Sequence, residues 1–60
     1  MYIIEVIDSG IYYWREFDGG RSWTNSIKDA AKFESIESAQ RKFNELSERR
    51  SNLRIVDISS

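Results

Sequence analysis

The hydrophobic pattern begins with two apolar segments on either side of Ser9-Gly10. Residues 2–8 (YIIEVID) and 11–17 (IYYWREF) are rich in β-branched and aromatic side chains, which is typical of strands. Gly10 can supply the positive φ that a two-residue turn needs. The pattern predicts a β-hairpin, a turn at residues 18–20 (DGG) and a candidate third strand at residues 21–24 (RSWT).

A helical pattern follows the hairpin. Ser26 and Asp29 have the spacing of a capping box, with Asp in place of the usual Glu or Gln, and predict one short helical turn at residues 27–31. Ser35 then caps a longer helix over residues 36–49. Its apolar side chains fall within about 80° of the helix circumference: Ile36, Ala39, Phe43 and Leu46.

Residues 53–58 (LRIVDI) complete the pattern as a final strand, so the element order is β-β-(β)-α-β. One amphipathic helix must pack on one face of an antiparallel sheet of three or four strands. The sequence contains no proline, repeat or linker that would divide it. We therefore expect a single two-layer α+β domain over residues 1–60, with a strand order that the pattern leaves open.

The predicted turn also assigns side chains to the two faces of the hairpin. A two-residue turn at Ser9-Gly10 places Val6 opposite Tyr13, and side chains alternate between faces along each strand. One face is expected to pack on the helix: Tyr2, Ile4, Val6, Ile11, Tyr13 and Phe17. The other face has no second helix to cover it: Ile3, Ile7, Tyr12 and Trp14.

An uncovered apolar face of this kind often marks an interaction surface. Tyr and Trp are also enriched among the residues that dominate binding energies. We therefore predict that Ile3, Ile7, Tyr12 and Trp14 form a protein-binding or self-association face. The alternative is that residues 21–24, or the segment around 26–33, fold over this face and make it a minor core. A turn one residue different in length would exchange the two faces.

The amino-acid composition limits which catalytic activities and metal sites the chain can have. The 60 residues include no Cys and no His, so disulfides, a structural zinc site, the commonest general base and a thiol nucleophile are all missing. We expect no enzymatic activity, no metal and no cofactor. A domain this small is marginally stable on its own. That marginal stability favours burial of further surface in a homodimer.

The charge pattern gives an alternative function. Nine basic and ten acidic residues leave a net charge of −1, without the basic surplus that is usual in nucleic-acid-binding proteins. Arg49, Arg50 and Arg54 nevertheless cluster around the helix exit, and exposed aromatic rings can stack on bases. A small nucleic-acid-binding accessory protein is therefore the second candidate. Arg49 and Arg50 have a simpler explanation, since cations stabilise the negative end of a helix.

The apolar segments also bear on location. None approaches the roughly 20 residues of a membrane span, and the N-terminal segment has no basic residues before its apolar run and carries Glu5 and Asp8 within it. We expect a soluble cytoplasmic protein without a membrane partner.

Residues 23–43 (WTNSIKDAAKFESIESAQRKF) carry a family resemblance. The matching positions are Trp23, Thr24, Ile27, Ala30 or Ala31, Phe33, Ser35 and Ala39. This pattern resembles that of small phage- and prophage-encoded β-β-(β)-α-β proteins. The resemblance implies a mobile-element origin, a location in the host cell cytoplasm, and stoichiometric binding that inhibits a host protein such as an anti-phage defence factor. It assigns no catalytic or inhibitory residue.

Overall fold

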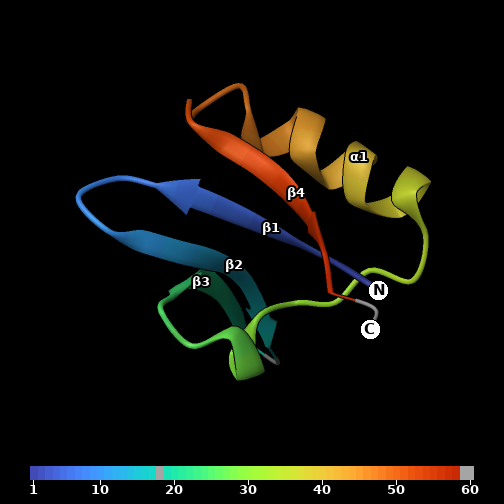
Figure 1. Cartoon of the computed structure of the whole chain (residues 1–60), viewed down its shortest axis with the longest axis horizontal. Coiled ribbons are helices and arrows are strands. Elements are labelled where there is room, and N and C mark those ends of the chain that lie inside the picture. The colour runs from blue at the N-terminus through green and yellow to red at the C-terminus, as the bar shows by residue number, and fades with distance from the viewer. Residues whose placement is uncertain (18, 59–60) are drawn as a thin grey trace.

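A computed structural model describes residues 1–17 and 19–58 as a four-stranded antiparallel sheet with one α-helix (Figure 1). The elements are β1 (Tyr2–Ile7), β2 (Ile11–Phe17), β3 (Gly20–Thr24), the 3₁₀ turn η1 (Ile27–Asp29), α1 (Ile36–Leu46) and β4 (Leu53–Asp57). The strands are arranged in the order β3-β2-β1-β4, and α1 packs against β1 and β4. The predicted α+β fold is confirmed, and the candidate third strand forms.

Strand β1 is the centre of the fold because it pairs with both β2 and β4. Four consecutive residues of β1 are buried: Ile3, Ile4, Glu5 and Val6. Side chains alternate between the two faces of a strand, so a continuous buried run means that both faces of β1 are covered. The apolar sequence YIIEVI fits this central position, with Glu5 as its exception.

The hairpin turn differs from the prediction. Ile7 pairs with Ile11 and Val6 with Tyr12, so the turn contains three residues rather than two. Ser9 adopts a left-handed φ of 57°, and the Asp8 amide donates to the Gly10 carbonyl at 2.8 Å. The extra turn residue shifts the register by one position and turns every side chain of β2 to the opposite face.

The two faces of the sheet follow from the observed register. The helix-side face carries Tyr2, Ile4, Val6, Tyr12, Trp14, Glu16, Arg21, Trp23, Leu53, Ile55 and Asp57. The far face carries Ile3, Glu5, Ile7, Ile11, Tyr13, Arg15, Phe17, Gly20, Ser22, Thr24, Arg54 and Val56. The predicted placement of Ile11, Tyr13 and Phe17 against the helix was therefore wrong.

A loop segment replaces β2 beside the first half of β1. The recorded β1–β2 register covers Glu5–Ile7 and Ile11–Tyr13. Nearer the N-terminus, Tyr2 and Phe33 exchange two backbone hydrogen bonds of 2.8 Å, and the Ala31 amide donates to the Trp14 carbonyl at 2.8 Å. The segment that follows η1 thus completes the sheet where the hairpin strands separate. This is pairing at a strand edge, so the alternative raised by the sequence, a segment folded over one face of the hairpin, stays a prediction.

The helix begins as predicted and ends earlier. The Ser35 hydroxyl oxygen accepts a hydrogen bond from the Ser38 amide at 3.2 Å, which confirms Ser35 as the cap. The helix ends at Leu46, whose carbonyl accepts the amides of Arg49 and Arg50 at 3.1 Å. This tight turn reverses the chain toward β4, with Asn52 in a left-handed conformation at φ 62°.

Ser26 makes no side-chain cap to η1, so the predicted capping box was wrong; instead, the Thr24 hydroxyl oxygen accepts the Ser26 amide at 3.1 Å. The predicted turn at residues 18–20 includes Asp18, which lies outside the described residues.

Candidate interaction surfaces

The four residues predicted to form one binding face are divided by the observed register. Ile3 is fully buried and Trp14 is 7% exposed, so neither offers a free surface. Ile7 and Tyr12 are 47% and 38% exposed, but they lie on opposite faces of the sheet. The predicted continuous patch of Ile3, Ile7, Tyr12 and Trp14 does not form, because its geometry depended on a two-residue turn.

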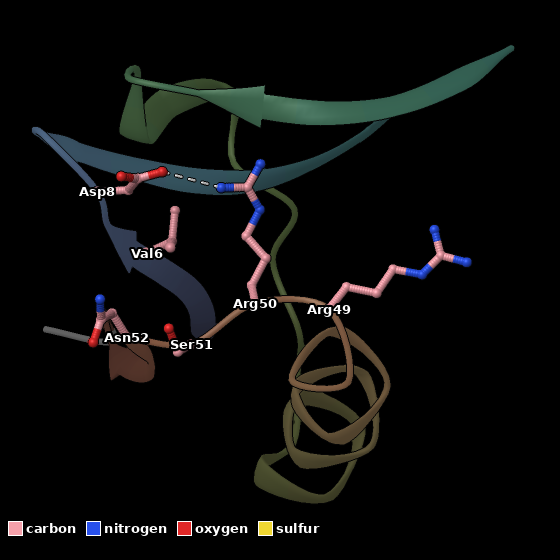
Figure 2. A pocket seen from close by; sticks show the side chains of 6 residues that line it. All are labelled: Val6, Asp8, Arg49, Arg50, Ser51 and Asn52. Atoms are coloured by element: carbon pink, nitrogen blue, oxygen red, sulfur yellow. Dashed lines mark hydrogen bonds and ion pairs between the residues drawn. The ribbon is translucent and has the colours of Figure 1, made fainter.

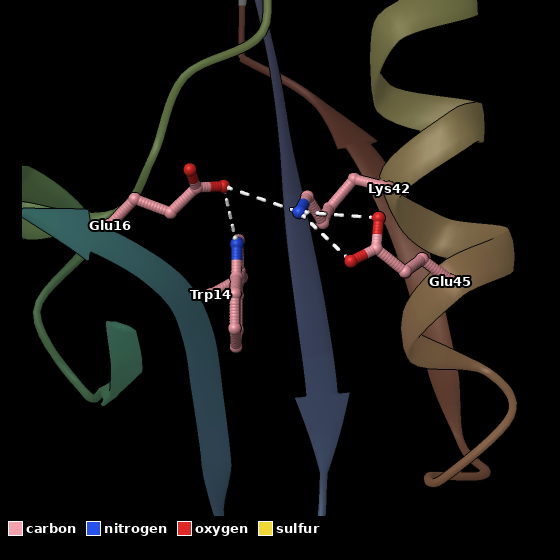
Figure 3. Close-up of polar contacts among 4 residues, drawn as sticks. All are labelled: Trp14, Glu16, Lys42 and Glu45. Carbon is pink, nitrogen blue, oxygen red and sulfur yellow. Dashed lines mark hydrogen bonds and ion pairs between the residues drawn. The ribbon is translucent and has the colours of Figure 1, made fainter. Parts of the chain in front are cut away.

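Trp14 is instead part of the core beneath the helix. Its ring packs edge-on against Trp23 in the paired strand, with ring centroids 5.3 Å apart. Its indole nitrogen donates to the Glu16 carboxylate at 2.7 Å, and the Lys42 ammonium lies 5.8 Å from its ring centroid (Figure 3). A buried indole N–H needs such an acceptor. Trp14 therefore joins the hairpin to the helix and is unsuited to binding a partner.

Lys42 of α1 links the helix to the hairpin by charge. Its ammonium lies 4.0 Å from the Glu16 carboxylate and 3.4 Å from that of Glu45 (Figure 3). The two carboxylate side chains are 43% and 57% exposed. Water screens pairs of this kind, so we expect them to contribute little to stability.

The three arginines of the proposed nucleic-acid contact do not share one surface. Arg50 donates to the Asp8 carboxylate at 3.3 Å and lies 5.4 Å from the Trp23 ring centroid, on the helix side of the sheet. Arg49 points away from this pair (Figure 2). Arg54 donates to Glu5 on the far face. Only Arg49 and Arg50 therefore remain as neighbours.

Shallow hollows surround Arg50. One, about 510 Å³, is lined by Val6, Asp8, Arg49, Arg50, Ser51 and Asn52 (Figure 2). Another, about 410 Å³, extends from Arg50 to Trp14 and Trp23 and is bordered by Glu45 and Glu48. Because both hollows are lined by acidic and basic residues together, neither presents a surface of one charge. In the described part of the chain, no three potential metal-ligating His, Cys, Asp or Glu residues come together.

Several exposed apolar side chains lie on the far face of the hairpin. Ile7 and Ile11 face each other across the strands and are 47% and 48% exposed. Along β2, the half-buried Tyr13 and Arg15 lead to Phe17, which is 47% exposed and lies 4.6 Å from the Arg15 guanidinium carbon. We call Ile7, Ile11, Tyr13, Arg15 and Phe17 the far-face stripe. Sequence reasoning found only Ile7 of this set as a surface residue.

An ion pair between a buried carboxylate and an exposed arginine lies on the same face as the far-face stripe. Glu5 is 5% exposed and sits directly opposite Arg54, whose Nε donates to its carboxylate. A buried carboxylate requires such a partner, and cross-strand opposite charges stabilise a sheet. The sequence pattern missed this pair because the pairing of β1 with β4 was not predicted.

Comparison with protein-family models, curated proteins and solved structures found no match to this chain. The resemblance to small phage proteins therefore stays a prediction from the sequence. No helix in residues 1–17 and 19–58 is long and apolar enough to cross a membrane.

Proposed function

We propose that this protein acts without catalysis, by binding another protein stoichiometrically through the far-face stripe. The observation that supports this proposal most strongly is the pair Ile7 and Ile11. Both isoleucines are about half exposed at directly opposed positions of the hairpin. Tyr13, Arg15 and Phe17 extend the apolar surface along a regular strand, which positions them more firmly than a loop would.

Burial of the exposed apolar side chains would favour binding of a partner. Each Å² of apolar surface removed from water contributes about 25 cal/mol of favourable free energy. Tyr and Arg add groups that recur at the centres of protein interfaces. Because β2 is already fixed by pairing with β1 and β3, its backbone loses little conformational freedom on binding.

The resemblance to small phage proteins supports a narrower proposal for the partner. We propose a bacterial host protein in the cytoplasm, with inhibition of a defence factor as the biological outcome. The homodimer expected from the small size is a separate proposal, because such a dimer must leave the far-face stripe free for the partner. Sedimentation equilibrium at high micromolar concentration tests it, with a mass near twice 7.1 kDa as the expected result.

Affinity capture from bacterial lysate with matched variants tests the binding proposal. The tagged protein should enrich one host protein at near-stoichiometric yield, and the Ile7→Ser, Ile11→Ser double variant should lose it. Ile36→Ser is the matched control, because Ile36 is 44% exposed but lies on α1. Circular dichroism must show that each variant is folded.

Two results would count against the proposal. Capture of the same protein by the folded double variant would place the binding site elsewhere. Equal losses with Ile11→Ser and Ile36→Ser would show that general surface hydrophobicity, rather than the far-face stripe, retained the protein.

A further inference from the structure

We infer that the far-face stripe recognises a partner surface that combines apolar side chains with carboxylates. This inference rests on the proposed binding function and adds the chemistry of the partner. It follows from which charged side chains lie on the far face and from how exposed each of them is.

Only three charged residues lie on the far face of the four described strands: Glu5, Arg15 and Arg54. Glu5 is buried and is neutralised by Arg54. The exposed ionic groups of this face are therefore guanidinium groups. Its apolar residues share the strands with these positive charges, whereas the exposed carboxylates of Glu16 and Glu45 lie on the helix side and on α1.

Arg15 is placed to receive a carboxylate. Within the described residues it forms no ion pair, and its guanidinium lies over the Phe17 ring. Docking an apolar surface against Phe17 would exclude water from the guanidinium, which strengthens its attraction to a carboxylate. The planar guanidinium can also bind both carboxylate oxygens at once.

Arg54 offers a second contact. Its side chain is 62% exposed although its Nε is bonded to Glu5. A guanidinium carries five N–H donors, so its terminal nitrogens remain able to bind a second acceptor. Arg15 and Arg54 belong to β2 and β4, on either side of β1. A partner that spans the far face therefore meets a cation on each side.

The same charges disfavour a second copy of this chain as the occupant. A two-fold dimer would place the same face on both sides of the interface. Both copies would then bring exposed guanidinium groups into one interface, with no exposed far-face carboxylate from the strands to balance them. Like charges brought together in an interface oppose association.

Titration of the ¹⁵N-labelled full chain with synthetic hexapeptides tests this inference by NMR. The first peptide alternates Glu and Leu, the second has Lys in place of Glu, and the third has Ser in place of Leu. The Glu-Leu peptide should give saturable shifts at the amides of Ile7, Ile11 and Tyr13. The Lys-Leu and Glu-Ser peptides should bind more weakly.

Arg15→Gln supplies the matching protein variant. Loss of one partly exposed charge contact should weaken binding of the Glu-Leu peptide about two- to fivefold. Arg41→Gln should leave the affinity unchanged, because Arg41 is exposed on α1.

Several outcomes would overturn the inference. They are equal binding of the Lys-Leu and Glu-Leu peptides, no far-face shifts at millimolar Glu-Leu peptide, or the same shifts with a ten-residue oligothymidylate. Far-face shifts that appear on concentrating the protein alone would make a second copy the occupant. Failure of the inferred carboxylate recognition can be distinguished from failure of the binding proposal. In the first case the Arg15→Gln variant would still capture the host protein at full yield, whereas the Ile7→Ser, Ile11→Ser variant would lose it.

Discussion

Trp14 and Ile11 lie three residues apart on β2 and have opposite environments. Trp14 faces the helix, packs against Trp23 and is 7% exposed. Ile11 faces away from the helix and is 48% exposed. Both are large apolar residues in the same strand, so composition alone does not distinguish core from surface. What separates them is the parity of their positions relative to the turn.

The two faces also differ in how their polar groups are used. On the helix side, Glu16 and Lys42 hold the Trp14 indole in place. On the far face, the Glu5–Arg54 pair closes over β1, while Arg15 is left beside exposed apolar residues. The polar groups of the helix side thus support the buried core, whereas the far face keeps apolar side chains exposed to solvent.

Trp14→Ala should have the largest effect on stability. Removing a buried Trp costs about 3–5 kcal/mol, which is comparable with the total of about 3–9 kcal/mol expected for a chain of this length. We expect the variant to be largely unfolded by circular dichroism without denaturant. Ile11→Ala, measured by urea unfolding, should lose less than about 1 kcal/mol.

Equal losses of unfolding free energy in these two variants would contradict the assignment of the faces. A folded Trp14→Ala protein combined with a strongly destabilised Ile11→Ala protein would reverse that assignment.

The Glu5–Arg54 pair should show an asymmetric response of intermediate size. Arg54→Met leaves the buried Glu5 carboxylate without its partner and should cost about 1–3 kcal/mol. Glu5→Gln keeps the shape and an acceptor oxygen, and it frees an arginine that water can solvate, so its cost should be smaller. Urea unfolding of both single variants and the double variant gives the coupling energy.

The reverse order, with Glu5→Gln more destabilising than Arg54→Met, would contradict burial of an ionised Glu5. Additive effects in the double variant would show that the two side chains do not interact.

Lys42→Met should have the smallest effect of the three. The Lys42 pairs with Glu16 and Glu45 join partly exposed groups, and its ammonium lies 5.8 Å from the Trp14 ring centroid, so Met removes only weak charge contacts. We expect the unfolding free energy to change by less than about 1 kcal/mol. A loss of 2 kcal/mol or more in urea unfolding would show that the helix depends on this charge contact.

Much of the fold could be predicted from local pattern. The hairpin segments, the helix cap at Ser35 and the final strand near Leu53–Asp57 all follow from signals within a few residues of each element. These signals act locally, so a sequence read in short windows reveals them. The helix end at Leu46 is a smaller miss, since the pattern continued to Arg49.

The candidate site depends on non-local geometry, which is why the prediction failed there. A single extra turn residue moved Tyr12 and Trp14 to the helix side and placed Ile11 on the surface. The pairing of Glu5 with Arg54 joins residues 49 positions apart, and the insertion of residues 31–33 beside β1 joins a loop to the N-terminus. No periodic pattern encodes contacts of this kind.

The hairpin register is the point on which the proposed surface depends, and backbone nuclear Overhauser effects measure it directly. The account predicts cross-strand contacts between Val6 and Tyr12 and between Ile7 and Ile11. Contacts between Val6 and Tyr13 and between Asp8 and Ile11 would instead establish a two-residue turn. That result would return Tyr12 and Trp14 to the far face and contradict the proposed binding surface.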